Sequence, residues 1–181
     1  MKALITGASS GIGRDMAKYL SSKGYDLVVV ARNKEALQQL KEEINTNVEV
    51  IPMDLKLKEN CYKLHELAKD VDVLINNAGF GICGEFTETD LEQEISLIET
   101  NIVALQILTK LYLKDMVRKN SGRILNVASI AGFMPGPLMS TYYASKNYVV
   151  SLTRAIDKEL RKNHSKVRMH LLCPRSCEYK F

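Results

Sequence analysis

The chain has few cysteines, no long apolar run and no dense run of one charge. Its 4 cysteines among 181 residues form no Cys-x-x-Cys pair and have no histidine at metal-ligand spacing, so we expect no metal site and reduced thiols in the cytoplasm. No apolar run approaches the roughly 20 residues needed to cross a membrane, and the first expected strand begins too close to Met1 to leave room for a signal peptide. A net charge of +4 without a basic cluster gives no reason to expect nucleic acid as a partner.

No linker, repeat or low-complexity segment interrupts the chain. The hydrophobic content of 46% and the charged content of 25% are ordinary for a globular domain, and the length fits one domain. Residues 26–31 contain the run Leu27-Val28-Val29-Val30, which is apolar on both faces. That pattern is typical of a central parallel strand covered by helices on both sides.

Short apolar segments alternate with amphipathic segments from end to end. Strands are expected at residues 3–6, 26–31, 48–53, 71–76, 123–128 and 167–173. Helices are expected at residues 14–23, 34–44, 59–68, 90–119 and 141–161. Regular alternation implies right-handed crossovers between parallel strands. The sequence therefore predicts an α/β fold, a Rossmann-like doubly wound parallel sheet of six strands with helices on both faces.

A glycine-rich segment, Thr6-Gly7-Ala8-Ser9-Ser10-Gly11-Ile12-Gly13, joins the first expected strand to the first helix. Glycines at such a place let the backbone turn tightly and approach a pyrophosphate, whose charge the helix N-terminus favours. The spacing differs from the common Gly-x-Gly-x-x-Gly pattern, and a glycine turn can be only a turn. The strand before it and the helix after it favour a dinucleotide site. The expected contacts are Gly7, Ser9, Ser10, Gly11, Ile12 and Gly13.

The end of the second strand indicates which dinucleotide is bound. An acidic residue there would bind the ribose 2′-hydroxyl of NAD, whereas an arginine accepts the 2′-phosphate of NADP. The chain has Arg32 at this point and no acidic residue, although Arg32 could also be an ordinary surface charge. We therefore expect NADP(H) to be preferred over NAD(H), with Ser9 and Ser10 able to reach the same phosphate.

Two later strand ends carry further candidates. Asp54 and Leu55 follow the third strand, and Asn77, Ala78 and Gly79 follow the fourth. Open parallel sheets bind ligands at these carboxyl ends, where Asp54 could accept a hydrogen bond from the adenine and the small residues let the backbone lie against the cofactor. A capping aspartate and a turn glycine would explain the same residues without a ligand.

Tyr142 and Lys146 lie four residues apart in an expected helix and so share one face. A nearby ammonium favours the phenolate, which would lower the tyrosine pKa from about 10 and suit a general acid or base. Ser129, at the end of the preceding strand, could donate to a substrate carbonyl oxygen. The Tyr-x-x-x-Lys pair alone arises by chance in many helices, but Ser129 and the glycine loop favour catalysis. Tyr143, rotated by about 100°, is expected to pack or to line a substrate wall, and Ser145 to be a small packing residue.

Together these motifs resemble the classical short-chain dehydrogenases/reductases, from Met1 to about Pro174. The resemblance implies a catalytic tetrad of Asn101, Ser129, Tyr142 and Lys146, in which Tyr142 is the acid/base, Ser129 polarises the carbonyl, Lys146 holds the ribose and Asn101 supports a proton-relay water. It also implies that Tyr142, Lys146 and Pro174 contact the cofactor. The implied reaction is reversible hydride exchange between NADP(H) and a small-molecule ketone or secondary alcohol, in a homo-oligomer.

The C-terminal end departs from the family pattern. Family members continue with Pro-Gly, a substrate loop with helices and a seventh strand, whereas here Arg175 follows Pro174 and the sequence stops at Phe181. We expect a domain at 1–174 that lacks the last helix and strand, and an atypical tail at 175–181. Two functions remain open: an NADP-dependent oxidoreductase, or a catalytically impaired, truncated nucleotide-binding remnant that acts as a binding or interaction module.

Overall fold

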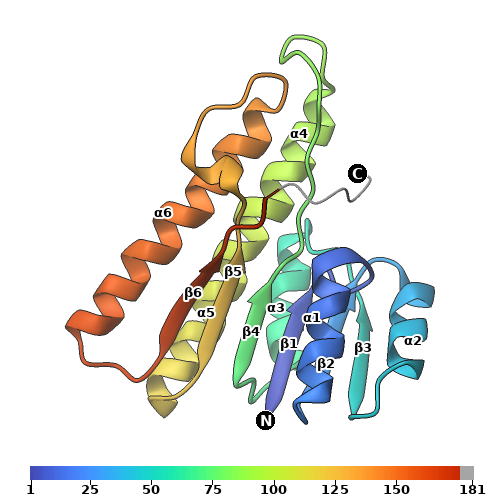
Figure 1. Cartoon of the computed structure of the whole chain (residues 1–181), viewed down its shortest axis with the longest axis vertical. Helices are drawn as coiled ribbons and strands as arrows, with labels where there is room; N and C mark the ends of the chain where they lie inside the picture. Colours follow the sequence, from blue (N-terminus) through green and yellow to red (C-terminus); the bar gives the residue numbers. More distant parts are fainter. Residues whose placement is uncertain (176–181) are drawn as a thin grey trace.

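Six parallel strands form one sheet in the computed structural model, which describes residues 1–175 (Figure 1). The strands are β1 (Lys2–Thr6), β2 (Asp26–Ala31), β3 (Val48–Pro52), β4 (Val73–Asn76), β5 (Arg123–Val127) and β6 (Arg168–Leu172). They lie in the order β3-β2-β1-β4-β5-β6, and every neighbouring pair is parallel. The predicted Rossmann-like doubly wound sheet is confirmed, and its strand order reverses between β1 and β4, where such sheets bind ligands.

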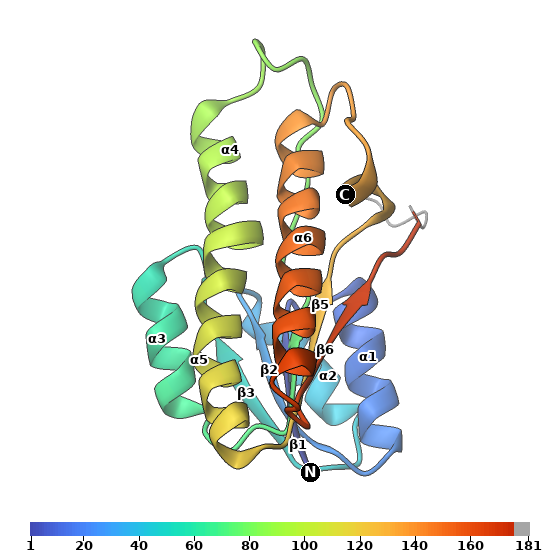
Figure 2. The same ribbon diagram turned by 90° about the vertical axis from the view of Figure 1, so that its left-hand side faces the viewer.

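Helices cover both faces of the sheet. They are α1 (Gly11–Ser22), α2 (Lys34–Glu42), α3 (Lys58–Leu67), α4 (Leu91–Ile98), α5 (Leu105–Lys119) and α6 (Ser140–Lys162). Figure 2 shows α3, α5 and α6 side by side on one face, with α1 and α2 on the other side of the sheet. The helices thus form two layers around the strands, as the fully apolar strand pattern predicts.

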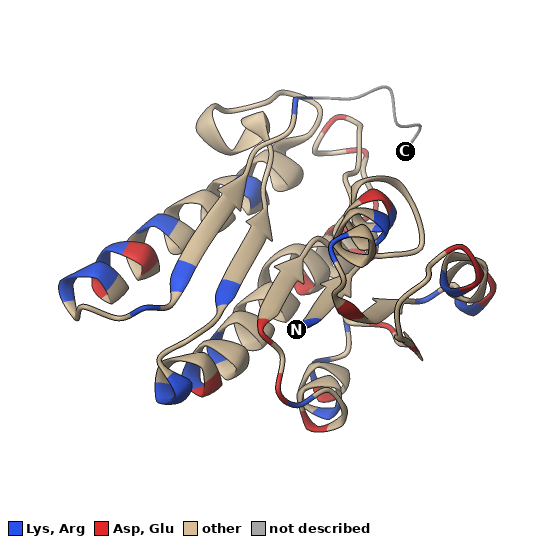
Figure 3. Ribbon diagram, turned by 60° about the horizontal axis from the view of Figure 1, so that its bottom comes forward, with Lys and Arg blue, Asp and Glu red and all other residues tan. Residues whose placement is uncertain are grey.

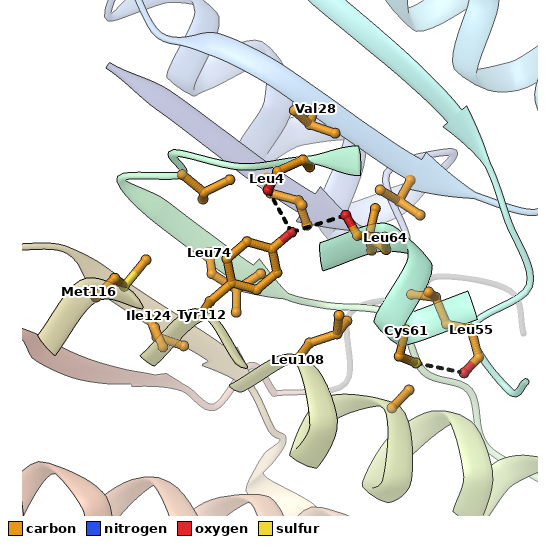
Figure 4. Packing of buried hydrophobic residues seen from close by; sticks show 14 of the residues in the cluster. Leu4, Val28, Leu55, Cys61, Leu64, Leu74, Leu108, Tyr112, Met116 and Ile124 are labelled. Carbon is orange, nitrogen blue, oxygen red and sulfur yellow. Dashed lines mark hydrogen bonds between the residues drawn. The ribbon is translucent and has the colours of Figure 1, made fainter. Parts of the chain in front are cut away.

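The core divides into two clusters because successive strand residues point to opposite faces. In β1, Leu4 packs toward α3 and α5, whereas Ala3 and Ile5 pack toward α1 and α2. Figure 4 shows the cluster on the α3 side, where the Tyr112 hydroxyl donates a hydrogen bond of 3.0 Å to the carbonyl oxygen of Ala68. The buried phenol thereby ties α5 to the end of α3 without leaving its polar atom unpaired.

Two local features differ from the predicted elements. The expected helix at 90–119 contains a π-helical segment, Glu99–Ala104, between α4 and α5. A short 3₁₀ helix, Ile130–Phe133, follows β5. Both escaped prediction because a π segment keeps a near-helical apolar pattern and a single 3₁₀ turn is too short for periodicity to register. Single-turn π-helical segments are frequent at functional sites, and short 3₁₀ turns are common connectors.

Lys and Arg residues occur together with Asp and Glu residues along the helices (Figure 3). Arg14 on α1 pairs with Glu43 at 2.5 Å, and His65 on α3 pairs with Asp115 on α5 at 2.6 Å. Within residues 1–175, none of the helices is both long enough and apolar enough to span a bilayer.

Candidate active site

A cavity of about 1180 Å³ opens at the carboxyl ends of the strands and extends from the β1–α1 loop to α6. Its wall contains nearly all of the residues that the sequence predicted as cofactor contacts, together with Ser129 and Tyr143. The predicted contacts in the wall are Gly7, Ser9, Ser10, Gly11, Ile12, Arg32, Asp54, Leu55, Asn77, Ala78, Gly79, Tyr142, Lys146 and Pro174. Residues distant in sequence are therefore brought to one continuous hollow.

The glycine loop has the backbone shape that its sequence predicts. Gly7 and Gly11 have φ angles of +67° and +51°, in the left-handed region that side chains disfavour. A Cβ at Gly7 would also lie 2.8 Å from the Asn77 side-chain nitrogen. Gly13, in contrast, lies outside the cavity wall, and a Cβ there would lie 2.3 Å from the carbonyl oxygen of Gly7. Close packing of α1 against the loop therefore accounts for Gly13.

Thr6, which the sequence analysis did not single out as a site residue, joins the glycine loop to the end of β4. Its hydroxyl oxygen accepts hydrogen bonds of 3.0 Å from the backbone N–H groups of Asn77 and Ala78. The Asn77 amide in turn donates to the carbonyl oxygens of Thr6 and Gly7, both at 3.1 Å. Asn77 thus holds the loop in shape from the cavity wall. A short hydroxyl side chain at a strand end beside a glycine was the one available signal for Thr6.

Arg32 is exposed at the end of β2 and makes no ion pair or hydrogen bond with another of residues 1–175. The side-chain oxygen of the neighbouring Asn33 is already used within the protein, because it accepts a hydrogen bond of 2.9 Å from the N–H of Ala36 and caps α2. Lys56, not predicted from the sequence, also reaches the cavity wall, and its backbone N–H donates to Asp54 Oδ1 at 3.1 Å. This end of the cavity therefore offers two cations and a carboxylate already engaged in a turn.

Lys146 is buried beneath the other end of the cavity. Its Nζ donates a hydrogen bond of 3.0 Å to the carbonyl oxygen of Val127 and lies 5.6 Å from the ring centre of Tyr142. Burial lowers the pKa of Lys146 to about 8. The ammonium is therefore close to Tyr142 but is bonded to the backbone.

The pKa of Tyr142 lies above its ordinary value, because burial of the phenol outweighs the opposing hydrogen bond with Ser129. The expected lowering of this pKa by Lys146 is thus wrong for the structure as it stands. The spacing of four residues placed both groups on one face but could not report burial. Ser129 also accepts a hydrogen bond of 3.2 Å from the N–H of Ala131, which orients its hydroxyl at the start of the 3₁₀ helix.

Asn101 is buried in the π-helical segment and stands behind the cavity wall. Its side-chain oxygen accepts from the N–H of Phe80 at 3.1 Å, and its amide donates to the carbonyl oxygen of Phe80 at 2.9 Å and to Ser145 Oγ at 3.1 Å. Ser145 donates in turn to the carbonyl oxygen of Tyr142 at 2.7 Å. Ser145 therefore does more than pack, since it links Asn101 to the backbone of Tyr142.

The remaining predictions concern cysteines, metals and the tail. Cys61, Cys83 and Cys173 are free thiols, and Cys177 lies outside the described residues. Residues 1–175 contain no cluster of three or more His, Cys, Asp or Glu side chains that could hold a metal ion. Of the expected tail at 175–181, Arg175 lines the cavity and residues 176–181 lie outside the described part of the chain.

Comparison with known proteins connects this site to a family. The sequence model described as short chain dehydrogenase matches residues 1–179. A very-long-chain 3-oxoacyl-CoA reductase of Pyrenophora tritici-repentis is 37% identical over 171 residues, which cover 87% of this chain and 50% of that protein.

Two solved structures match the fold closely. A short-chain dehydrogenase from Sphingobium yanoikuyae in complex with NADPH has a TM-score of 0.90 at 33% identity, over 98% of this chain and 71% of that one. A short chain dehydrogenase/reductase from Burkholderia phymatum in complex with NAD has a TM-score of 0.89 at 31% identity, over 96% and 65% of the two chains. The chain is a member of the short-chain dehydrogenase/reductase family, the oxidoreductases that use a nicotinamide cofactor on CH–OH and C=O groups.

Proposed function

We propose that this chain is an NADP(H)-dependent oxidoreductase that transfers hydride between the nicotinamide and a small ketone or secondary alcohol. One observation carries the proposal: a single cavity joins the glycine loop and Arg32 at one end to Ser129, Tyr142 and Lys146 at the other. A dinucleotide is long enough to span such a site, with its phosphates at a helix N-terminus and its reactive ring near the acid/base.

The residues present fit this cofactor. Gly7 and Gly79 line the cavity, and only glycine fits there without a shift of the wall, since a Cβ at either position would lie 2.8 Å from a neighbouring side-chain atom. Ser10 precedes α1 without a side-chain capping bond, so the first N–H groups of the helix stay available to an anion. The 2′-phosphate of NADP would meet Arg32, which has no competing partner among the described residues, with Lys56 on the same wall.

The bound cofactor would supply the hydride, and the chain's own residues would control the proton. In the direction of reduction, Ser129 would donate a hydrogen bond to the carbonyl oxygen of the substrate. Tyr142 would give its phenolic proton to that oxygen as the carbonyl carbon gains hydride. Lys146 would stabilise the resulting phenolate by its charge. Asn101, linked through Ser145, would hold the backbone around Tyr142 and support the proton relay.

We further propose that residues 1–174 act as one cofactor-binding domain, in the cytoplasm and as a homo-oligomer. The free thiols of Cys61, Cys83 and Cys173 suit a reducing compartment. The exposed apolar side chains of Val117 on α5 and Tyr148 on α6 suit contact with a second copy.

The test is turnover by the purified chain. NADPH consumption is followed in the presence of a panel of ketones of graded size, with product alcohol measured to establish one alcohol formed per NADPH consumed. The proposal expects stoichiometric reduction of at least one ketone. Tight NADPH binding without turnover on any ketone or alcohol would contradict it and would favour the nucleotide-binding module without catalysis.

A further inference from the structure

Glu94 is a buried carboxylate whose polar partners are two threonine hydroxyls. Only 9% of the residue is exposed, and among residues 1–175 the only other buried charged residue is Lys146. Its Oε1 accepts a hydrogen bond of 2.5 Å from Thr89, and its Oε2 accepts one of 2.9 Å from Thr141. No lysine, arginine or histidine of the described chain lies within ion-pair distance of it. A buried carboxylate held by hydroxyls alone is unusual, since burial of a charge is unfavourable without strong partners.

The two threonines belong to two different segments of the chain, each of which contributes other residues to the cavity wall. Thr89 lies in the segment that connects β4 to α4, and Thr141 lies in the first turn of α6, immediately before Tyr142. The helices α4 and α6 pack against each other (Figure 2), so Glu94 on α4 can contact both the β4–α4 segment and the first turn of α6. We refer to Thr89, Glu94 and Thr141 as the Glu94 clamp.

The first turn of α6 has no cap of its own. Its N-cap residue, Met139, makes no side-chain capping hydrogen bond. A carboxylate near a helix N-terminus interacts favourably with the helix dipole, and here Glu94 supplies that charge from another helix. The start of the helix that carries Tyr142 therefore depends on a side chain from α4.

The segment between β4 and α4 and the segment that leads into α6 also contact each other close to the phenol of Tyr142. The N–H of Gly84 donates a hydrogen bond of 2.8 Å to the carbonyl oxygen of Leu138. The backbone of Leu138 has a φ of +65°, in the left-handed region. A Cβ at Gly81 would lie 3.3 Å from the ring of Tyr142, so the segment between β4 and α4 is packed directly on that ring. A shift of either segment would therefore move the phenol.

We propose that Glu94 is a positioning residue for Tyr142. By holding Thr89 and Thr141 together, it fixes the first turn of α6 and the segment packed on the Tyr142 ring, and so sets the direction of the phenol in the cavity. Glu94 itself lies outside the cavity wall and touches neither the cofactor region nor the substrate region. The proposal rests on the proposed function in that Tyr142 is taken as the acid/base.

Four variants test the clamp. Glu94→Leu and Thr141→Val remove the hydrogen bonds while keeping the side chains similar in size, and Glu94→Gln and Thr141→Ser keep a hydrogen-bonding group at each position. Glu88→Leu is the matched control, because Glu88 is exposed just before the same helix and makes no side-chain contact in the clamp. Steady-state kinetics, NADPH binding and hydrogen exchange of the amides in the first turn of α6 are measured for each.

Glu94→Leu and Thr141→Val are expected to lower kcat by about 10- to 100-fold, since small misplacements of a reacting group have effects of that order. NADPH affinity should stay within about twofold, because uniform binding is untouched. The double variant Glu94→Leu with Thr141→Val should be no worse than Glu94→Leu alone, because Glu94→Leu already breaks the contact with Thr141. Glu94→Gln and Thr141→Ser should recover most of kcat, and only the damaging variants should speed exchange in the first turn of α6.

The proposal is overturned if Glu94→Leu keeps wild-type kcat, or if kcat and NADPH affinity fall together with no recovery in Glu94→Gln, as general unfolding would cause. If Glu94→Leu does not fold, Thr141→Val, which only replaces a hydroxyl by a methyl, decides in its place. If the wild-type chain reduces no ketone, the proposed function fails. In that case unchanged exchange in Glu94→Leu would overturn the clamp as well, whereas faster exchange confined to the first turn of α6 would support it.

Discussion

Lys146 donates a hydrogen bond from its ammonium to the carbonyl oxygen of Val127, at 3.0 Å, from a position that is almost entirely buried. Val127 ends β5, so the lysine on α6 is tied to the floor of the cavity next to Ser129. Because burial lowers the pKa of Lys146 to about 8, its charge is lost within a range of pH that enzymes tolerate. The burial of this ammonium leads to two predictions about pH dependence.

The first prediction concerns the rate of ketone reduction. The kcat/KM for reduction should be level below neutral pH and should fall about tenfold per pH unit above a pKa near 8, since uncharged Lys146 no longer stabilises the Tyr142 phenolate. A pH–rate profile from about pH 6 to about pH 10 measures this. Lys146→Met, which cannot titrate, should have low activity without that limb. A wild-type profile with no inflection between about pH 7 and about pH 9 would contradict the assignment.

The second prediction concerns stability. The pKa of Lys146 falls from 10.5 to about 8 on folding, so between these values the unfolded chain binds more protons and stability rises with pH. Below pH 8 the buried charge opposes folding in full. Lys146→Met should therefore be more stable than wild type near neutral pH, with the difference in Tm shrinking as pH rises above 8. Thermal melts of both proteins at matched pH measure it, and a constant difference would count against the burial argument.

Arg32 should determine the choice of cofactor. Arg32→Ala should weaken NADPH binding by about ten- to a hundredfold and leave NADH binding nearly unchanged, because only NADPH has the phosphate that a charge-assisted bond can reach. Fluorescence titration of both cofactors measures the ratio. Lys41→Ala, which removes an exposed cation at the far end of α2, is the control for general electrostatics. Equal wild-type affinities for NADPH and NADH would refute NADP(H) preference.

The two adjacent tyrosines should differ sharply in function. Tyr142→Phe should lower ketone reduction by about 10²- to 10⁴-fold while NADPH still binds, since the general acid is lost and the ring remains. Tyr143→Phe should be mild, because Tyr143 packs edge-on against Tyr142 with ring centres 6.2 Å apart and its ring lies against Gly136. Kinetics of both variants at saturating NADPH measure the contrast. An inactive Tyr143→Phe beside an active Tyr142→Phe would reverse the assignment.

Gly13 should be required for packing. In Gly13→Ala the new Cβ would lie 2.3 Å from the carbonyl oxygen of Gly7, so α1 or the loop must move and the free energy of unfolding should fall by about 1–3 kcal/mol or more. Gly24→Ala is the control, since no atom lies within 4 Å of its Cβ and only the strain of a φ of +80° opposes it, at roughly 1–2 kcal/mol. Thermal melts should give a larger loss for Gly13→Ala. The packing explanation fails if Gly24→Ala has the greater effect.

The sequence by itself determined the features that depend on neighbouring residues. Apolar runs such as Val28 to Val30 predicted buried parallel strands, and the glycine loop between a strand and a helix predicted a phosphate-binding turn, since both patterns follow from local backbone geometry. The spacing of Tyr142 and Lys146 placed them on one face of α6 for the same reason.

Only the tertiary structure decided how these parts act on one another. Thr6 meets Asn77 and Glu94 meets Thr141 across separations of 71 and 47 residues, and no local pattern encodes such a pairing. The pKa of Tyr142 is raised where spacing alone predicted lowering, because burial depends on everything packed around the phenol. Spacing indicates which groups can meet along a helix, whereas desolvation and long-range hydrogen bonds arise only when distant segments pack together.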